Sequence, residues 1–404
     1  SPAMTTPSSE RSPTPFSLRK IAVPAFGPSI LYGIGNGAIL PVIALSAREL
    51  DASVALSGLI VSLIGIGSLV SNIPAALITS RYGEKRSMVG AAALSVVSLV
   101  LCIFAVHVWM LATGVFLVGV AASVFLLARQ TYLMDAVPAY MRARALSTLG
   151  GTNRIGVFVG PFAGAALIHF LGLQGGYWIG LAAMAGAGLI ALLAPEMAPP
   201  QRRSDRHAKP RVQDIARDHA KTFLTLGLGI LLVSALRSSR QVVVPLWADH
   251  LGLGATAASV IYGLVAAVDM SVFYPAGTVM DRFGRIWVAL PSALLMGLSL
   301  MLTPLSTGVT TFLLFSLILG FGNGISSGIV MTLGADAAPA QGRTEFLGIW
   351  RLIADIGNSV GPVILAGITA IASLAVGVSA IGTLGLGAAA VFWKWVPRKP
   401  TASH

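Results

Sequence analysis

The chain has 404 residues, of which 55% are hydrophobic and only 10% charged, and its mean hydropathy is +0.82. A soluble domain carries about a quarter charged residues, so this composition excludes an ordinary soluble protein and indicates a polytopic membrane protein. Apolar runs of about 20 residues exclude a transmembrane β-barrel, whose strands are shorter and alternate in polarity. The sequence has no phosphate-binding loop and no Cys/His cluster with metal-ligand spacing, which argues against an ATP-driven pump and a metal site.

Twelve apolar segments are long enough to cross a bilayer as helices at about 1.5 Å per residue. In chain order they are residues 21–46, 54–79, 87–106, 108–134, 146–171, 174–194, 222–247, 255–280, 286–305, 309–335, 345–371 and 373–395. Polar stretches predict a disordered segment at 1–17, a linker at 196–220 and a tail at 397–404. The linker divides the chain into two halves of six helices each, residues 18–195 and 221–396.

Basic residues are distributed unevenly over the predicted loops. Most of the 27 Lys and Arg residues fall in the N-terminal segment, the linker, the C-terminus and the loops after even-numbered helices. The loops on the other side hold only Arg48. By the positive-inside rule, both termini and the linker are expected on the cytoplasmic side of the inner membrane. The net charge of +12 is therefore a topology signal, with some attraction to anionic lipid, and does not indicate nucleic-acid binding.

The two halves repeat at a constant offset of 201 residues. Gly83 corresponds to Gly284, Gly156 corresponds to Gly357, and the Gly-Pro pair at 160–161 recurs at 361–362. Because each half has an even number of helices, both copies have the same orientation in the membrane. Two six-helix bundles related by a pseudo-two-fold axis along the membrane normal are therefore expected.

Two short motifs lie within this repeat. The loop after the eighth predicted helix reads AGTVMDRFGR, and the fifth predicted helix contains GVFVGPFAGA. The first resembles the loop signature of the major facilitator superfamily, and the second resembles a motif of its drug:proton antiporter branch. The resemblance implies two bundles that rock about a central site. It also implies gating or conformational roles for Gly277, Asp281, Arg282, Gly284 and Arg285, for Arg81 and Gly83 in the first-half copy, and for Gly156, Gly160, Pro161 and Gly164.

Small residues and a loop carboxylate have physical reasons to occupy these positions. Gly156, Gly160 and Gly164 form a stripe at intervals of four residues, which allows close helix approach. Pro161 is expected to bend the helix. The Asp281 carboxylate is expected against the N-terminus of a neighbouring helix, where the helix dipole favours negative charge.

In the family fold the first, fourth, seventh and tenth helices line a central cavity, so polar residues on them are candidate substrate ligands. Arg237 and Arg240 are three residues apart on the seventh helix and share a face, with Gln241 next in the chain. Asn36 is the repeat equivalent of Arg237 and is expected across the cavity. This set favours an anionic or strongly polar substrate; the alternative is an arginine that snorkels outward or binds helix carbonyls.

The fourth predicted helix adds Arg129 and Tyr132 as candidate cavity-wall groups. The alternative for Arg129 is a gate or an anchor for a cytoplasmic loop. The antiporter branch usually has an arginine early in this helix, where this chain has Val115, and the first helix has no carboxylate. These departures argue against specificity for cationic drugs.

Arg154 and Asp269 lie at matching depth. Each is 12 residues from a cytoplasmic landmark, Arg142 or Asp281, which corresponds to about 18 Å along a helix. The fifth and eighth helices meet between the bundles in the family fold, so the two are expected to pair and to separate as the bundles rock. Desolvation then favours protonation of the separated carboxylate, which makes this pair the candidate for proton coupling. The alternative is a permanent ion pair.

Asp355 is the repeat equivalent of Arg154 and follows Arg351 by one helical turn. These two residues are the second candidates for proton coupling. The alternative is an i, i+4 ion pair that satisfies itself within one helix.

The sequence therefore predicts a secondary active transporter rather than an enzyme, working as a monomer without cofactor or metal. The leading function is proton-coupled efflux of a small organic compound, anionic or polar amphiphilic, by alternating access. The alternatives are a proton-coupled importer or exchanger of an organic anion, and a non-transporting sensor on the same fold. The expected partners are the small-molecule substrate, protons and membrane lipids.

Overall fold

The structure, a computed structural model, describes residues 18–138, 142–195 and 211–398. Within these ranges twelve helices are long and apolar enough to cross a membrane, which confirms the predicted number of spans. The predicted disordered segment 1–17 lies outside the described residues, as do 196–210 of the predicted linker and 399–404 of the tail.

The twelve helices begin and end within a few residues of the predicted bounds. The first six are α1 (Ala22–Glu49), α2 (Val54–Tyr82), α3 (Glu84–Ile103), α4 (Val108–Ala136), α5 (Arg142–Leu171) and α6 (Gln174–Leu193). The second six are α9 (Leu226–His250), α10 (Ala255–Phe283), α11 (Ile286–Leu302), α12 (Val309–Ala337), α13 (Arg343–Ile371) and α14 (Leu374–Trp395). Short 3-10 turns precede α1 at Leu18–Ile21 and follow α11 at Thr303–Leu305.

Local sequence explains several helix ends. The side chains of Ser53 and Ser373 precede α2 and α14 and each accept a hydrogen bond from the backbone N–H three residues on, at 3.1 and 3.2 Å. Helices α2 and α10 end at Gly83 and Gly284, whose φ angles are +85° and +107°. Such angles are open to glycine and strained for other residues, which gives these two repeat-equivalent positions a structural role.

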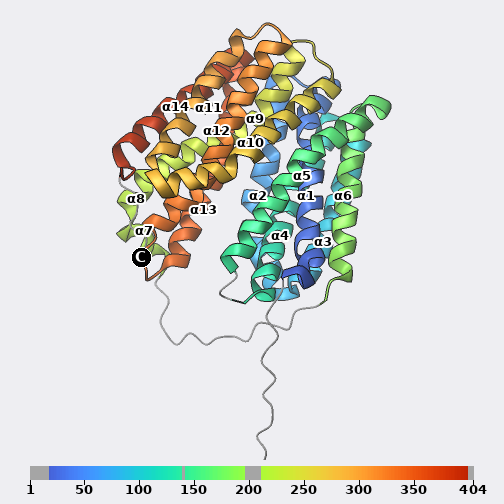
Figure 1. The fold of residues 1–404 in the computed structure, drawn as a ribbon. Coiled ribbons are helices and arrows are strands. Elements are labelled where there is room, and N and C mark those ends of the chain that lie inside the picture. The colour runs from blue at the N-terminus through green and yellow to red at the C-terminus, as the bar shows by residue number, and fades with distance from the viewer. Residues whose placement is uncertain (1–17, 139–141, 196–210, 399–404) are drawn as a thin grey trace, which may run out of the picture.

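The helices form two bundles, α1–α6 and α9–α14, which stand side by side and diverge toward the lower end of Figure 1. Helix pairs in one bundle have their equivalents in the other: α1 packs on α5 as α9 packs on α13, and α2 packs on α4 as α10 packs on α12. Between the bundles, α5 packs on α10 and α2 packs on α13. This arrangement confirms the predicted fold of two repeated six-helix bundles.

Glycines bring helices of the same bundle into backbone contact. A Cβ atom at Gly156 or Gly160 of α5 would overlap carbonyl oxygens of α1, and one at Gly357 or Gly361 of α13 would overlap carbonyl oxygens of α9. The third stripe residue, Gly164, has only ordinary van der Waals distances to α1. The glycine stripe therefore joins α5 to α1 within the first bundle, which is close helix approach of the predicted kind.

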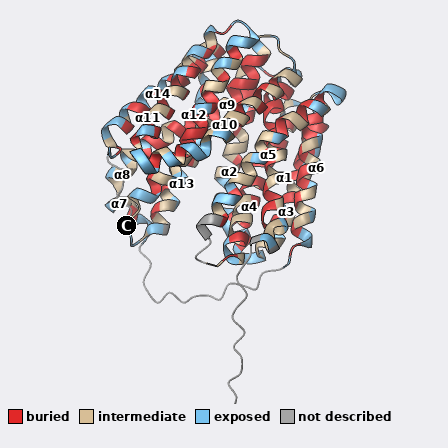
Figure 2. Ribbon diagram, in the orientation of Figure 1, coloured by how far each residue is buried: buried red, intermediate tan, exposed pale blue. Residues whose placement is uncertain are grey.

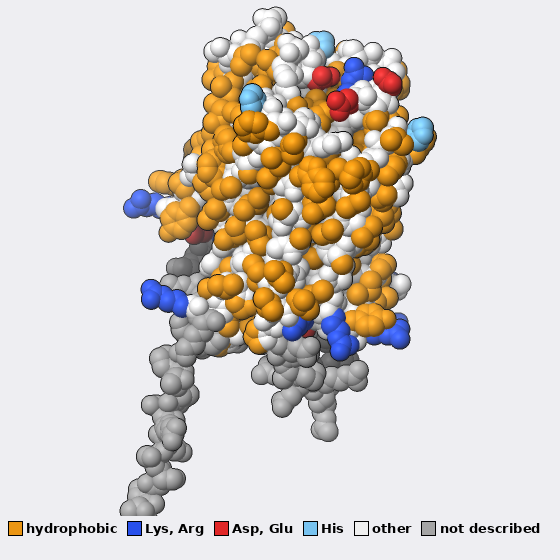
Figure 3. Space-filling model, turned by 90° about the vertical axis from the view of Figure 1, so that its right-hand side faces the viewer, with side chains coloured by type: hydrophobic (Ala, Val, Ile, Leu, Met, Phe, Trp, Pro, Cys, Tyr) orange, Lys and Arg blue, Asp and Glu red, His pale blue; other side chains and the backbone are white. Residues whose placement is uncertain are grey.

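Hydrophobic side chains cover the middle of the molecule, while Lys and Arg gather toward its lower end in the view of Figure 3. Buried residues fill the helix faces that point into each bundle, and exposed residues lie on the outer faces and at both ends (Figure 2). We call the end where α2 meets α3 and α10 meets α11 the basic end, and the other the opposite end. An apolar surface on twelve long helices indicates a multi-pass membrane protein.

The predicted linker, 196–220, is wrong at its C-terminal end. The structure has short helices at α7 (Val212–Asp218) and α8 (Ala220–Leu224), and α7 packs on α13. Ile215 of α7 is buried, and the His219 ring meets the Phe346 ring edge-on at 5.5 Å. These apolar contacts attach residues 212–220 to the second bundle, although their polar composition had suggested a free linker.

Candidate functional site

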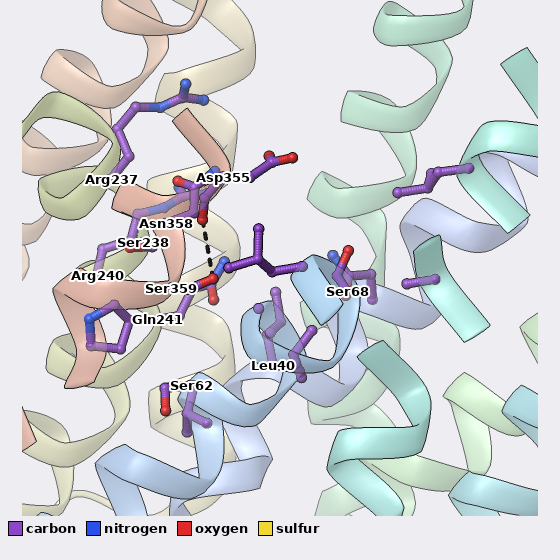
Figure 4. Close-up of a pocket in the computed structure, with 18 of the residues that line it drawn as sticks. Leu40, Ser62, Ser68, Arg237, Ser238, Arg240, Gln241, Asp355, Asn358 and Ser359 are labelled. Carbon is purple, nitrogen blue, oxygen red and sulfur yellow. Dashed lines mark hydrogen bonds between the residues drawn. The ribbon is translucent and has the colours of Figure 1, made fainter. Parts of the chain in front are cut away.

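A cavity of about 340 Å³ lies between the two bundles. Helices α1, α2 and α4 line it from one bundle, and α9, α12 and α13 line it from the other. Figure 4 shows Arg237, Arg240 and Gln241 of α9 gathered on one side, with Ser68 of α2 across from them. The polar and charged lining residues are Tyr32, Asn36, Ser62, Ser68, Arg237, Ser238, Arg240, Gln241, Asn323, Asp355, Asn358 and Ser359.

The two arginines of α9 line this cavity, as do Asn36 and Gln241. Arg237 donates from Nε to Oδ1 of Asn323 at 3.1 Å, and Arg240 places Nη1 3.8 Å from Oδ2 of Asp269. The Nε of Arg240 is buried without a hydrogen-bond partner. The alternative of snorkelling outward therefore does not describe either arginine, and both retain donor capacity toward the cavity.

Asp269 of α10 is the centre of a polar network that spans both bundles. Arg154 of α5 donates from Nη1 to Asp269 Oδ1 at 2.6 Å and from Nη2 to Ser327 Oγ at 2.5 Å. Asn323 of α12 donates from Nδ2 to Asp269 Oδ2 at 2.8 Å. The Arg154 and Asp269 side chains are only 20% and 13% exposed, so water screens their attraction weakly. The structure thus brings together the two residues whose equal depths predicted a pair.

The network differs from the predicted pair in one respect. Asp269 has a cation on its own bundle, Arg240, in addition to Arg154 on the other. If α5 and α10 part, Asp269 loses its shortest ion pair and keeps Arg240 at the longer distance. Removing Arg154 would therefore weaken the stabilisation of the charged carboxylate without abolishing it.

The alternative for Arg351 and Asp355, an ion pair within one helix, does not describe the structure, and their role in proton coupling stays a prediction. No salt bridge joins them in the described part of α13, and Arg351 is exposed. Asp355 instead accepts a hydrogen bond at Oδ2 from Nδ2 of Asn72 on α2, at 3.3 Å. Asn72 in turn accepts at Oδ1 from Ser123 Oγ at 2.8 Å. Asp355 thus faces the other bundle, where a neutral amide takes the place of the expected cation.

Arg129 and Tyr132 do not line the cavity, so their predicted contact with substrate is not supported. Arg129 donates from Nη1 to Ser29 Oγ at 2.8 Å, and its guanidinium lies 6.0 Å from the centre of the Tyr32 ring. Tyr132 is buried and donates to the Pro195 carbonyl at 3.3 Å. Both side chains are held inside the first bundle, although the Nε of Arg129 is buried without a hydrogen-bond partner. The alternative of a gate or a loop anchor for Arg129 stays a prediction.

Arg285 connects three helix ends at the basic end. Its Nη1 lies 2.9 Å from Asp281 Oδ1, and its Nε lies 2.9 Å from Asp336 Oδ2 on α12. The hydrogen bonds with Asp336 and Asp281 raise the pKa of Arg285 above its ordinary value. Asp281 itself is 80% exposed and pairs with Arg285, the residue that immediately precedes α11. The salt bridges of Arg285 thus connect the end of α10 and the start of α11 to the end of α12.

Arg282 of the loop signature and Arg81 of its first-half copy have fewer polar contacts than Arg285. Arg282 is exposed and forms no salt bridge within the part of the chain that the structure describes. Arg81 stacks on the neighbouring Tyr82 ring, with its guanidinium carbon 5.5 Å from the ring centre. The conformational roles of these residues remain predictions.

Sequence reasoning missed Asn72, Asn323 and Ser327 of the polar contacts between the bundles. It also missed several polar residues that line the cavity, among them Ser68 and Asn358. The search for expensive groups in apolar helices considered only ionisable side chains, whereas a buried amide also needs partners. Asn323 lies among apolar residues and glycines in GFGNGISSG, so its isolation was a readable signal. Ser327 had no comparable signal, because serine can satisfy itself on the helix backbone.

Two repeated six-helix bundles that enclose a polar cavity form the architecture of a membrane carrier. A profile of the Major Facilitator Superfamily matches residues 28–340 and 226–404. The chain belongs to this superfamily and is one of its transporters. The assignment of residues 277–285 and 156–164 to motifs of the superfamily stays a prediction.

Comparison with curated proteins finds multidrug resistance proteins at low identity. The chain is 28% identical over 159 residues to the multidrug resistance protein MdtG of Citrobacter koseri, covering 38% of this chain and 39% of the relative. The MdtG of Enterobacter lignolyticus is 28% identical over 152 residues, covering 37% and 36%. The matched stretch thus spans less than two fifths of the length of these relatives.

Solved structures share the fold over nearly the whole chain. A D-xylose-proton symporter superposes with a TM-score of 0.74 at 18% identity, covering 94% of this chain and 98% of the other. A POT family transporter superposes with a TM-score of 0.77 at 12% identity, covering 93% and 95%. At these identities the similarity establishes the fold alone.

Proposed function

We propose that the protein is a proton-coupled exporter of a small anionic or polar amphiphilic compound, working by alternating access. The observation that carries the proposal is the Asp269 network. Its carboxylate pairs with Arg154 on one bundle and with Arg240 and Asn323 on the other, beside a cavity lined by Arg237 and Arg240. A carboxylate shared across a moving interface changes its electrostatic partners as the bundles separate, which is the requirement for coupling a proton to that motion.

The charge of the cavity supports the substrate class. Arg237 and Arg240 present guanidinium groups to it, and among the described residues the hydrogen-bond partner of Arg237 is a neutral amide, Asn323. Guanidinium groups bind carboxylate and phosphate through paired hydrogen bonds. Asn36, Gln241 and Ser68 add neutral polar groups for the rest of the solute.

The direction of transport is supported by the relatives. The partial matches are to proteins described as multidrug resistance proteins, which favours export. Import or exchange of an organic anion is the second candidate function, because an arginine-lined cavity serves either direction equally. The proton gradient imposed in the experiment below separates the two.

The two ends of the molecule support alternating access. At the opposite end, Arg48 of α1 and Asp249 of α9 form a salt bridge of 3.5 Å between the bundles. At the basic end the bundles diverge, which is the arrangement expected for a state open to the cytoplasm (Figure 1). We further propose that the basic end and both termini lie in the cytoplasm, that the membrane is the inner membrane, and that a single copy transports.

The test is transport by the purified chain in sealed proteoliposomes with a proton gradient imposed in either direction. A panel of organic anions is compared with neutral and cationic compounds of the same size. We expect anion movement against its own gradient, in the direction opposite to the protons. Movement in the same direction as protons would favour import, and movement of cations alone would contradict the proposal.

Arg237→Ala tests the cavity in the same assay. We expect the apparent affinity for the anion to fall about tenfold or more, because a charged hydrogen bond is worth about 1.5–3 kcal/mol. Arg217→Ala, which changes an exposed arginine on α7, is the matched control and should leave transport as in the wild type. An unchanged affinity in Arg237→Ala would remove Arg237 from the site.

A further inference from the structure

A second cavity lies away from the transport site, on the outer surface of the first bundle. It is a groove of about 360 Å³ between α2, α3 and α4. Its wall on α3 consists of Arg86, Gly90 and Leu94, which follow each other at intervals of four residues and therefore lie on one helix face. Eight residues of helix give the groove a length of about 12 Å along the membrane normal, starting at the basic end.

The groove opens toward lipid and is apolar along its length. Ala91, Ala121 and Val124 line it from inside the bundle, and Ile78 and Tyr82 flank it with exposed fractions of 38% and 52%. These are surfaces that hydrocarbon covers in a membrane protein. An alkyl chain lying in the groove would replace loose lipid contacts with closer packing.

Glycine keeps the groove open. A Cβ atom built at Gly90 would meet no atom within 4 Å, unlike those at the glycines that join helices. Gly90 therefore does not serve helix packing, and its missing side chain leaves space that faces lipid. A large side chain at this position would occupy the groove without displacing protein atoms.

One cation stands at the basic end of the groove. Arg86 is exposed and forms no salt bridge within the described residues. Ser87, its neighbour in the lining, is already satisfied, because its Oγ donates to the Gly83 carbonyl at 2.7 Å. Arg86 is therefore the group that remains available to an anion at the level of the lipid headgroups.

The second bundle supplies an internal comparison. The repeat offset places Trp287 at the position of Arg86 and Pro291 at the position of Gly90. The second copy therefore has bulk where the first has space, and an indole where the first has a charge. The fold alone does not require a glycine and a cation at these two positions, since the other half has neither there.

We propose that the groove of α2, α3 and α4 binds one acyl chain of an anionic phospholipid, whose phosphate pairs with Arg86. Basic positions between membrane helices on the cytoplasmic side select anionic headgroups, and guanidinium pairs with phosphate through two parallel hydrogen bonds. The groove selects the chain by shape, and Arg86 selects the headgroup by charge. The site is separate from the transport cavity, and the proposal does not depend on the direction of transport.

The test is native mass spectrometry of the full chain in detergent, titrated with dioleoyl-phosphatidylglycerol and with dioleoyl-phosphatidylcholine. We expect the anionic lipid to bind more tightly. Arg86→Gln should weaken binding of phosphatidylglycerol at least about tenfold and leave phosphatidylcholine unchanged. Gly90→Phe should remove tight binding of both lipids, because it fills the groove.

Two matched controls separate this site from general attraction to the membrane. Lys85→Gln removes the charge next to Arg86 in the chain, which does not line the groove, and Gly367→Phe fills open space on α13. Both should bind lipid as the wild type does. Equal weakening by Lys85→Gln and Arg86→Gln, or wild-type binding by Gly90→Phe, would overturn the proposal.

Folding is checked by the melting temperature of each variant without added lipid. Gly90→Leu is a smaller substitution, to be used if Gly90→Phe lowers the melting temperature. It should also weaken the binding of both lipids. Wild-type lipid binding by a folded Gly90→Leu would likewise overturn the proposal.

Discussion

Helices α5 and α13 are two copies of one helix, and they have opposite charges at the position that contacts the other bundle. Each has a glycine pair against the first helix of its bundle, Gly156 and Gly160 in α5 and Gly357 and Gly361 in α13. Each has an ionisable residue two positions before the first glycine and therefore on the opposite side of the helix. That residue is Arg154 in α5 and Asp355 in α13, and both reach the other bundle.

The partners of these two residues are also repeat equivalents. The Arg154 guanidinium lies 4.1 Å from the centre of the Phe273 ring, and Asp355 accepts from Asn72 at the position that corresponds to Phe273. Arg154 has Asp269 in addition, whereas the position that corresponds to Asp269 is Ser68. The duplicated scaffold keeps the glycine contacts in both copies, while the salt bridge between bundles occurs in one, and we expect proton coupling there.

The largest expected effect follows from removing the charge at that contact. Asp269→Asn leaves Arg154 and Arg240 without their carboxylate and fixes a neutral side chain at the interface. Accumulation driven by a proton gradient should fall at least about 100-fold, equivalent to about 3 kcal/mol, while downhill exchange continues. Both are measured in proteoliposomes, with Asp214→Asn on α7 as the exposed control. Full accumulation in Asp269→Asn would place coupling elsewhere, and Asp355 becomes the next candidate.

Substituting alanine for a contact glycine should destabilise the protein equally in both copies of the helix. Gly156→Ala and Gly357→Ala each force a methyl group into the backbone of a neighbouring helix. Each should lower the free energy of unfolding by about 2 kcal/mol, measured by denaturant titration in detergent. Gly150→Ala, in open space on α5, is the control and should be neutral or slightly stabilising. A loss in only one copy would mean that the scaffold is not equivalent on the two sides.

A smaller effect is expected at the second contact between the bundles. Asp355→Asn keeps an oxygen that accepts from Asn72, so only the charge is lost. Gradient-driven transport should fall at most about fivefold, since a hydrogen bond to a charged group exceeds a neutral one by about 1 kcal/mol. The same transport assay measures it beside Asp269→Asn. Equal losses in the two variants would show that both contacts share the coupling.

The smallest effect concerns the salt bridge at the opposite end. Arg48 and Asp249 are 39% and 40% exposed, and such pairs contribute about 0–1 kcal/mol. Arg48→Ala should favour separation of the bundles at this end by about 0.5 kcal/mol, seen as a shift in distances between spin labels. At about 1 M salt, where screening acts within about 3 Å, wild type and variant should coincide. A difference that persists in salt would contradict a purely ionic contact.

Much of the fold could be predicted because hydropathy and repetition act over long stretches. Twelve apolar runs fix the number of spans, and the 201-residue offset fixes the relation of the bundles. The pairing of Arg154 with Asp269 was also accessible, because depth along a membrane helix follows directly from residue number.

The contacts of the other candidate residues depended on how each helix is rotated about its own axis. Residue number predicts this rotation less well than it predicts depth. Arg129 was at a suitable depth, yet its side chain turns into the first bundle toward Ser29. For Asp355 the sequence left a pair with Arg351 on its own helix as the alternative, and the side chain contacts Asn72 of α2 instead. Helix α4 is apolar all round, so it has almost no amphipathic stripe to show which side Arg129 faces.

The glycine joints at the basic end have a mechanical consequence. Only Gly83 separates α2 from α3, and only Gly284 and Arg285 separate α10 from α11. A connection of one or two residues leaves the two helices little freedom to move independently. Helix α2 packs on α13 of the other bundle, while α3 packs on α4 and α6 of its own. A displacement of α2 or α10 at the contact between the bundles is therefore expected to move the helix that follows it, α3 or α11. Each of these two helix pairs should then move as one rigid unit.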